Sequence, residues 1–396
     1  MYRILFISHE RKMGGANFAL LELAQNLQKA GHDISVVVLY SGCPIDRELK
    51  RAGIKTFPCF FGWWQQPEYW SPILKAGFRV LHWLQWLAVI RISRYVRKQK
   101  IQIIHSNSSV VDIGAQVAHK TGCRHVWHFR EFGKEDYRLE YMYSRNKVID
   151  YIHDNSNMII FISDALQNAY ADVVGKCPHR MIYDGIVPRS VISSERAPLV
   201  FKHSGRNLPY QFLVTGNISP GKNQKLVLEA ANILVNEMKV KKEDFCVHFA
   251  GAETALEESK AYGKAIREYI LGNHLENVIL HGFVKNMNQL RQQIHAEIIP
   301  SVSEAYGRVT LEAMMACNLV IASDSGSNPE LVGEPGNGLL FKSNNANDLA
   351  LKMKFAIENA CTQYIERAYE YVYRVHTHEA ACKAVEDVYE QVMGND

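Results

Sequence analysis

Short apolar runs rich in β-branched residues alternate with stretches of helical periodicity along most of the chain. Most of these runs are apolar at every position, which is typical of parallel strands covered on both faces. One intervening stretch, 223–238, places Val227, Ala230, Ala231 and Leu234 on a single helical face. This alternation predicts doubly wound α/β sheets. The predicted strands are 3–8, 34–39, 101–105, 125–128 and 158–162 in the first half, and 212–215, 246–250, 278–280, 297–300, 319–322 and 339–341 in the second.

The length of the chain predicts two domains, because 396 residues exceed what one ordinary core holds. A polar, turn-rich stretch at 188–209 separates the halves and is the predicted linker. We therefore expect one Rossmann-like domain over 1–190 and a second over 191–375. The last segment, 376–396, is helical with no strand after it, so we expect its helix to pack back toward the first domain.

Composition narrows the class of protein. Hydrophobic residues make up 47% and charged residues 22%, which is ordinary for a soluble globular chain. The net charge of +4 argues against a dedicated nucleic-acid binder, so we expect no nucleic-acid partner. The eight cysteines are scattered, with no CxxC pair, as in reduced cytosolic proteins. The first apolar run is short and reads as a buried strand rather than a signal peptide, so we expect a cytoplasmic protein.

The segment 300–317, PSVSEAYGRVTLEAMMAC, carries the strongest chemical pattern. A predicted strand ends at Pro300, and after a small polar loop a helix begins near Gly307. Backbone N–H groups at such a helix start suit a diphosphate. Glu304 in the loop can accept hydrogen bonds from sugar hydroxyls, and Glu312 in the helix can accept from both hydroxyls of a ribose. Each glutamate taken alone has an alternative interpretation, a solvated side chain near a helix start.

The string SEAYGRVTLEA, with seven residues between its glutamates, resembles the E-x7-E signature of family-4 glycosyltransferases of the GT-B fold. The strand LVIAS, the turn DSGSNPEL and Asn337–Gly338 follow in the order of that family. Upstream, VTGNISPGKNQ resembles its diphosphate-binding strand, loop and helix, and HERKMGGANFAL resembles its glycine-rich first loop. The resemblance implies two Rossmann-like domains facing across a cleft, and transfer of a sugar with retention from a nucleotide diphosphate, expected to be UDP.

The resemblance also implies roles for individual residues. It assigns Lys222 to the diphosphate, Glu304 to the donor sugar and Glu312 to the ribose. Gly14 and Gly15 would let the first loop approach the reacting centre without a side-chain clash. The remaining nucleotide-binding candidates follow the loop into the helix and are Ala305, Tyr306, Gly307 and Arg308.

One departure from the family concerns the phosphate. The family has an arginine directly after the glycine of the diphosphate loop, and this chain has Asn217. An amide offers donors without charge, so Lys222, the helix start and Arg308 are expected to carry more of the phosphate binding.

In the first half, His128 lies at the end of a predicted strand, where Rossmann-like domains direct their ligands. The resemblance implies that this histidine faces the donor sugar, which makes Glu304 and His128 the candidate catalytic residues. Arg130 and Glu131 follow and are expected on the acceptor or phosphate side. A lone histidine is more often structural, and that alternative stays open.

No metal or other cofactor is expected. The chain has no D-x-D sequence and no His/Asp/Glu spacing typical of three metal ligands. A lysine and a helix dipole can neutralise a leaving diphosphate instead.

The stretch 60–100 holds five of the six tryptophans. Two interpretations of 71–100 remain open: a helix lying in an anionic membrane surface at the inner face of the cell membrane, or a core helix with a solvated basic end. The first suits a lipid-linked acceptor. The basic residues involved are Lys75, Arg79, Arg91, Arg94, Arg97, Lys98 and Lys100.

The preferred function is transfer of a hexosyl or N-acetylhexosaminyl unit from a UDP-sugar to a carbohydrate or lipid-linked glycan in polysaccharide or glycan synthesis. Two alternatives come from other classes. A sugar-nucleotide epimerase would need paired acid and base groups, and no such pair is identified. A non-catalytic partner subunit is favoured only by Asn217.

Overall fold

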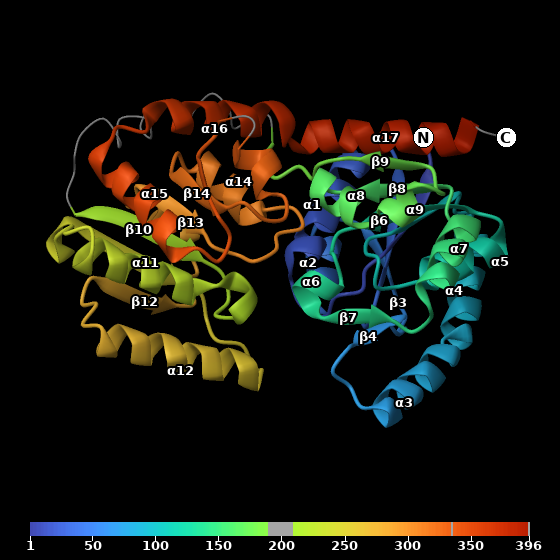
Figure 1. The fold of residues 1–396 in the computed structure, drawn as a ribbon. Helices are drawn as coiled ribbons and strands as arrows, with labels where there is room; N and C mark the ends of the chain where they lie inside the picture. Colours follow the sequence, from blue (N-terminus) through green and yellow to red (C-terminus); the bar gives the residue numbers. More distant parts are fainter. Residues whose placement is uncertain (189–208, 334–335, 395–396) are drawn as a thin grey trace. The chain divides into compact units, whose positions relative to one another are not determined.

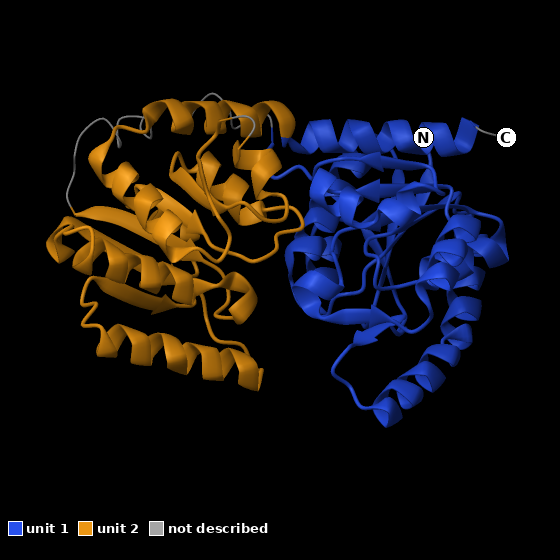
Figure 2. Cartoon of the chain, viewed as in Figure 1, with its two compact units in different colours: residues 1–188, 376–396 blue, residues 189–375 orange. Residues whose placement is uncertain are grey.

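The computed structural model describes residues 1–188, 209–333 and 336–394. Two compact units make up the chain, and Figure 2 shows them in blue and orange. Unit 1 comprises 1–188 and 376–396, and unit 2 comprises 189–375. Residues 189–208 lie outside the described residues. They include the predicted domain boundary at 190 and all of the predicted linker, 188–209, except its two end residues.

Unit 1 is built on a parallel sheet with the strand order β3-β2-β1-β5-β6-β8-β9 (Figure 1). Its central strands are apolar throughout and buried on both faces, as the hydrophobic pattern predicts. The strands are β1 (Arg3–Ile7), β2 (Asp33–Val38), β3 (Lys55–Pro58), β5 (Ile103–Ser106), β6 (Arg124–Phe129), β8 (Met158–Phe161) and β9 (His179–Met181). The two edge strands, β3 and β9, were not predicted, because they are short, polar and partly exposed.

Helices cover the sheet of unit 1, among them the last helix of the chain. This helix, α17 (His378–Gly394), packs on α1 (Gly15–Lys29), and Leu20, Leu27 and Val388 belong to one apolar cluster. The C-terminal segment is therefore part of the core of unit 1. The other helices of unit 1 are α2 (Pro44–Arg51), α3 (Pro72–Trp83), α4 (Trp86–Gln99), α5 (Ile113–Thr121), α6 (Lys134–Tyr137), α7 (Arg145–Asn155), α8 (Asp164–Ala169) and α9 (Ala171–Val174).

A small antiparallel pair, β4 (Gln65–Pro67) with β7 (Leu139–Tyr141), lies beside the main sheet of unit 1. It follows Trp64, which is buried and stacks on Trp127 with 5.4 Å between ring centroids. The indole N–H of Trp64 donates to the carbonyl of Ser109 at 2.7 Å, so the polar atom of this buried ring is satisfied.

Unit 2 has a six-stranded parallel sheet with the order β12-β11-β10-β13-β14-β15. The strands are β10 (Tyr210–Thr215), β11 (Phe245–Ala250), β12 (Val278–Gly282), β13 (Ala296–Ile299), β14 (Leu319–Ser323) and β15 (Leu339–Phe341). All six were predicted, to within two residues at each end. The helices are η3 (Pro220–Lys222), α11 (Gln224–Asn236), η4 (Lys242–Asp244), α12 (Glu257–Gly272), α13 (Met287–Arg291), α14 (Arg308–Met315), η5 (Pro329–Gly333), α15 (Ala346–Glu358) and α16 (Thr362–Val375).

The strand order reverses once in each sheet, between β1 and β5 in unit 1 and between β10 and β13 in unit 2. The prediction of two doubly wound α/β domains is confirmed. Ligands of such sheets bind where the order reverses, beyond the carboxyl ends of the strands. The loops that leave β1, β5, β10 and β13 are therefore the places to look for a site.

Candidate functional site

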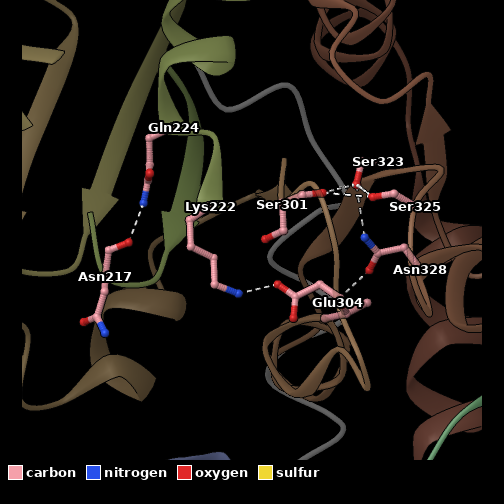
Figure 3. A network of polar contacts seen from close by, with 9 residues as sticks. Asn217, Lys222, Gln224, Ser301, Glu304, Ser323, Ser325 and Asn328 are labelled. Atoms are coloured by element: carbon pink, nitrogen blue, oxygen red, sulfur yellow. Dashed lines mark hydrogen bonds and ion pairs between the residues drawn. The ribbon is translucent and has the colours of Figure 1, made fainter. Parts of the chain in front are cut away.

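The loop after β10 places Lys222 at the reversal point of unit 2. Gly216 has a positive φ of 138°, and a Cβ added to Gly251 would lie 1.8 Å from the Gly216 carbonyl oxygen, so the loop packs tightly on the end of β11. The ammonium group of Lys222 points at the carboxylate of Glu304 and forms an ion pair with it (Figure 3). Asn217 is exposed, and its backbone carbonyl accepts a hydrogen bond from the side chain of Gln224 at 2.9 Å.

The loop after β13 brings Glu304 to the same place. The backbone N–H of Val302 donates to the carbonyl of Gly221 at 3.0 Å, which ties the two loops together. The Glu304 carbonyl accepts from the N–H of Ser327 at 2.8 Å. Gly326 has a φ of 57°, and a Cβ there would lie 2.3 Å from the Glu304 carbonyl oxygen. Only glycine fits this turn, and it fixes the backbone that carries Glu304.

Serine and asparagine side chains hold the ends of β13 and β14 together. The carbonyl of Ser301 accepts from the hydroxyls of Ser323 at 2.7 Å and Ser325 at 3.0 Å (Figure 3). Asn328 donates to the hydroxyl of Ser323 at 3.3 Å. These hydrogen bonds therefore brace the loop that presents Glu304 against the end of β14.

Helix α14 begins directly after Gly307, as predicted. Gly307 is the N-cap, with a φ of 81°, and it contributes no side-chain cap. An α-helix leaves its first N–H groups without intrahelical acceptors, which suits an anion. Tyr306 is buried and Ala305 half-buried, so these two predicted nucleotide-binding residues lie in the wall of the loop next to the helix start.

Glu312 lies within α14 and has two arginine partners. Nη1 of Arg291 donates to its Oε2 at 2.9 Å, and Nε of Arg308 donates to its Oε1 at 3.2 Å. Arg308, predicted to assist the phosphate, is thus engaged with Glu312. Arg291 also donates to both carboxylate oxygens of Glu297, at 2.9 and 3.2 Å. Burial alone would lower the pKa of Arg291, but the carboxylates of Glu297 and Glu312 raise it above its usual value.

Arg291 and Glu297 are functional candidates that were not predicted from the sequence. Glu297 is fully buried in β13, where a charge interrupts an otherwise apolar strand. A buried carboxylate requires a cationic partner. A glutamate within an apolar predicted strand could therefore have indicated a buried ion pair.

In unit 1 the glycine-rich loop leads into the start of α1. Glu10, which the sequence analysis also missed, places its carboxylate there and accepts from the N–H of Asn17 at 3.3 Å. Burial raises the pKa of Glu10, although hydrogen bonds from the backbone of Asn17 and Gly14 oppose the shift. A Cβ on Gly14 would lie 2.8 Å from Oε1 of Glu10, whereas a Cβ on Gly15 would meet no atom within 4 Å. Gly14 accommodates Glu10, and Gly15 leaves open space.

His128 and Arg130 lie together at the end of β6 and are both buried. Arg130 donates from Nη2 to Nδ1 of His128 at 3.2 Å and from Nε to the side-chain oxygen of Asn107 at 2.8 Å. Its Nη1 forms an ion pair with Asp184. Burial, followed by the charge of Arg130, lowers the pKa of His128 well below its usual value, so the ring is neutral.

Glu131 holds the turn that follows β5. Its Oε1 accepts from the hydroxyl of Ser108 at 2.8 Å and from both the N–H and the hydroxyl of Ser109 at 2.6 Å. The side chain is buried, and burial raises its pKa. The structure thus gives Glu131 a bracing position, and its predicted role toward the acceptor or phosphate stays a prediction.

The stretch 71–100 forms α3 and α4, which differ in burial. One face of α4 is buried, including Val89, Ile92 and Val96. Trp83 and Trp86, however, are 70% and 46% exposed, so the core interpretation is wrong for these two side chains. Within the described ranges, Pro72–Gln99 is also the one helical stretch long and apolar enough to cross a membrane, and 22% of its most apolar window is buried.

Within the described part of the chain, no cluster of three or more His, Cys, Asp or Glu side chains is arranged to hold a metal ion.

Comparison with known proteins identifies the family. Residues 13–189 match the sequence model of Glycosyltransferase Family 4, and residues 198–373 match that of Glycosyl transferases group 1. An uncharacterized glycosyltransferase of Methanocaldococcus jannaschii is 25% identical over 269 residues, which are 67% of this chain and 68% of that protein. The chain belongs to the family-4 glycosyltransferases.

Solved structures show the same architecture. HepE of Anabaena in complex with UDP aligns with a TM-score of 0.78 at 18% identity, over 98% of this chain and all (100%) of that one. A glycosyltransferase from Rickettsia africae aligns with a TM-score of 0.76 at 16% identity, over 100% of this chain and 99% of that one. The fold is therefore GT-B.

Proposed function

We propose that this glycosyltransferase moves a hexosyl or N-acetylhexosaminyl unit from a UDP-sugar to a carbohydrate or lipid-linked glycan, with retention at the anomeric carbon, in polysaccharide or glycan synthesis. The observation that carries the proposal is the pairing of Lys222 with Glu304 at the reversal point of unit 2, beside the start of α14. A cation, a carboxylate and a helix start at one place match the diphosphate and hydroxyl groups of a nucleotide sugar.

The reaction needs charge stabilisation more than a reactive side chain. As the bond between the anomeric carbon and the phosphate oxygen breaks, negative charge develops on the diphosphate. Lys222 then moves its ammonium from Glu304 to the phosphate, and the freed carboxylate accepts from the sugar hydroxyls. The acceptor hydroxyl forms the new bond on the same face and gives its proton to the leaving diphosphate. Same-face attack is the route that the family resemblance implies.

The ribose is assigned to Glu312. The two arginines orient its carboxylate, and 34% of the side chain is exposed. A ribose with both hydroxyls can donate to it, whereas a dideoxyribose cannot.

We propose that no metal takes part. Lys222 and the N–H groups of α14 supply the positive charge that a divalent cation would otherwise bring to the diphosphate. Turnover should persist in excess EDTA, and loss of turnover that magnesium or manganese restores would overturn this part of the proposal.

A panel of nucleotide sugars tests the proposal, with thermal unfolding to find the donor and UDP release to measure transfer. A bound donor stabilises the fold by mass action. Transfer predicts UDP release that depends on an added acceptor. Conversion of the donor sugar without UDP release would favour an epimerase, and binding without any conversion would favour a non-catalytic subunit.

A second observation bears on where the protein works. Residues 71–100 contain seven lysines and arginines and no acidic residue. Figure 1 shows α3 extending away from the sheet of unit 1, and its apolar side chains are exposed, among them Ile73 at 84% and Leu81 at 64%. We propose that the protein is cytoplasmic and docks this segment on the anionic inner face of the cell membrane, where each cation contributes about 1 kcal/mol.

Vesicle co-sedimentation tests the docking. The protein should bind phosphatidylglycerol vesicles at low salt, leave them at high salt, and ignore phosphatidylcholine. A Trp83→Ala/Trp86→Ala variant and an Arg91/Arg94/Arg97→Glu variant should both lose binding. The control is Phe283→Ala, which removes an aromatic side chain that is 80% exposed in unit 2. Failure of the wild type to bind, or an equal loss in the control, would refute the docking surface.

A further inference from the structure

A chain of buried polar side chains runs through unit 1 from α17 to β6. The hydroxyl of Tyr389 lies 2.7 Å from Nδ1 of His105, and Nε2 of His105 lies 3.1 Å from Nδ1 of His128. Nη2 of Arg130 lies 3.2 Å from the same Nδ1 of His128. Tyr389 and His105 are fully buried, and His128 is 1% exposed. Because these groups are shielded from solvent, each N–H or O–H in this series of side chains can donate only to a neighbouring side chain.

The arginine decides the direction of every hydrogen bond in the chain. A guanidinium can only donate, so Nδ1 of His128 must accept, and the neutral ring carries its proton on Nε2. His105 then donates from its own Nε2 to His128, because two lone pairs would otherwise face each other. His105 consequently accepts at Nδ1, and the hydroxyl of Tyr389 is the donor. One arrangement of protons is compatible with all three contacts, and in it His105 and Arg130 share the single lone pair on Nδ1 of His128.

The last group in the chain has no partner. Nε2 of His128 is buried and makes no hydrogen bond to any residue that the structure describes. A buried donor without a hydrogen-bond partner destabilises a folded protein and is uncommon, so a functional reason for this one is worth seeking. His128 also lines a small cavity of unit 1, together with Ala19, Asn26, Tyr183 and Gly185. The unpaired N–H donor of a ring that lines a cavity fits an acceptor oxygen of a ligand.

We infer that Tyr389, His105 and Arg130 are positioning residues that hold His128 in its Nε2–H form, as a fixed neutral donor to a sugar oxygen of the substrate. This inference rests on the proposed function for the identity of the ligand. It also excludes one role for His128. A ring whose Nδ1 is already occupied and whose Nε2 is already protonated cannot take a proton from an acceptor hydroxyl, so His128 orients the sugar and is not a general base.

The inference gives the C-terminal helix a part in the site of unit 1. Tyr389 lies on α17, and the chain of hydrogen bonds is the route by which that helix acts on β6. The ring of Tyr389 also belongs to the apolar cluster shared by α1 and α17, so its aromatic part packs while its hydroxyl orients His105.

Nitrogen-15 spectra of the histidine rings test the proton arrangement in the full-length protein without substrate. His128 and His105 should each show a protonated Nε2 and an unprotonated Nδ1. A His128 ring with its proton on Nδ1, or with both nitrogens protonated at neutral pH, would overturn the inference. This result does not depend on whether any sugar is transferred, so it is separable from the proposed function.

Variants then test the link to turnover of the UDP-sugar that the donor panel identifies. Tyr389→Phe keeps the ring and removes the donor to Nδ1 of His105, so the Nε2–H form of His105 is held less firmly and kcat should fall roughly five- to tenfold, with the donor KM changed less. His128→Gln, whose amide nitrogen reaches the place of Nε2, should retain more kcat than His128→Asn, whose amide ends near Nδ1. A purely structural role predicts a lower unfolding temperature for Tyr389→Phe, unchanged kcat, and equal activity in Gln and Asn variants. That pattern would refute the positioning role.

Discussion

Arg291 and Glu312 form an ion pair in which Nη1 of the guanidinium lies 2.9 Å from Oε2 of the carboxylate. The arginine is 3% exposed on its side chain and the glutamate 34%. A buried cation thus orients a partly exposed carboxylate. The orientation of the Glu312 carboxylate is therefore fixed before a ligand binds, and its exposed part can accept hydrogen bonds from that ligand.

The first prediction concerns the ribose. Wild-type protein should bind UDP more tightly than its 2′,3′-dideoxy analogue, because only the ribose can donate to Glu312. Glu312→Ala should weaken UDP binding by about tenfold or more and bind both nucleotides equally. Titration calorimetry measures all four affinities. Equal affinity of the wild type for both nucleotides would remove the ribose from Glu312.

The second prediction concerns stability. Arg291→Met leaves the fully buried Glu297 without its cation and should reduce the free energy of unfolding by about 3–5 kcal/mol. Adding Glu297→Leu removes the uncompensated charge and should restore most of the loss. Urea unfolding of the single and double variants gives the coupling between the two sites. Purely additive losses would show that Arg291 and Glu297 do not depend on each other.

The third prediction concerns the diphosphate. Lys222→Ala should lower kcat by roughly 10²–10³, since the neutral Asn217 cannot replace the missing charge. Asn217→Arg should leave nucleotide affinity equal or higher, because the side chain is exposed and has room for a cation. Near-normal kinetics of Lys222→Ala would place the phosphate elsewhere.

The fourth prediction separates two tryptophans of the stretch 60–100. Trp83→Ala removes a side chain that is 70% exposed and should change the free energy of unfolding by no more than about 0.5 kcal/mol. Trp64→Ala removes a ring that is 2% exposed and stacked on Trp127, and should cost about 3–5 kcal/mol. A large loss of stability in Trp83→Ala would show that α3 is packed in solution.

The architecture was largely readable from the sequence, because parallel strands buried on both faces are apolar runs that few other elements imitate. β10, β13 and the start of α14 were predicted, and with them the place of Lys222 and Glu304 at one end of a sheet. The edge strands β3 and β9 were missed because a strand half exposed to solvent has no apolar run.

The partners of the predicted residues were not readable in the same way. Arg291 and Glu312 are 21 residues apart, and Tyr389 and His105 are 284 apart. Such contacts depend on which strands and helices pack together, and local sequence patterns do not indicate that packing. The burial of Glu131 on Ser108 and Ser109, and the exposure of Trp83, also follow from packing.

Product analysis tests the central claim most directly. The wild-type protein is incubated with UDP-glucose, or with whichever UDP-sugar stabilises it, and with a glycan acceptor, and the UDP and the new glycoside are both quantified. We expect one UDP for each glycoside formed, with the α-configuration of the donor kept in the product when proton NMR resolves its anomeric signal. A β-linked product would contradict retention, and UDP formed without any glycoside would contradict transfer itself.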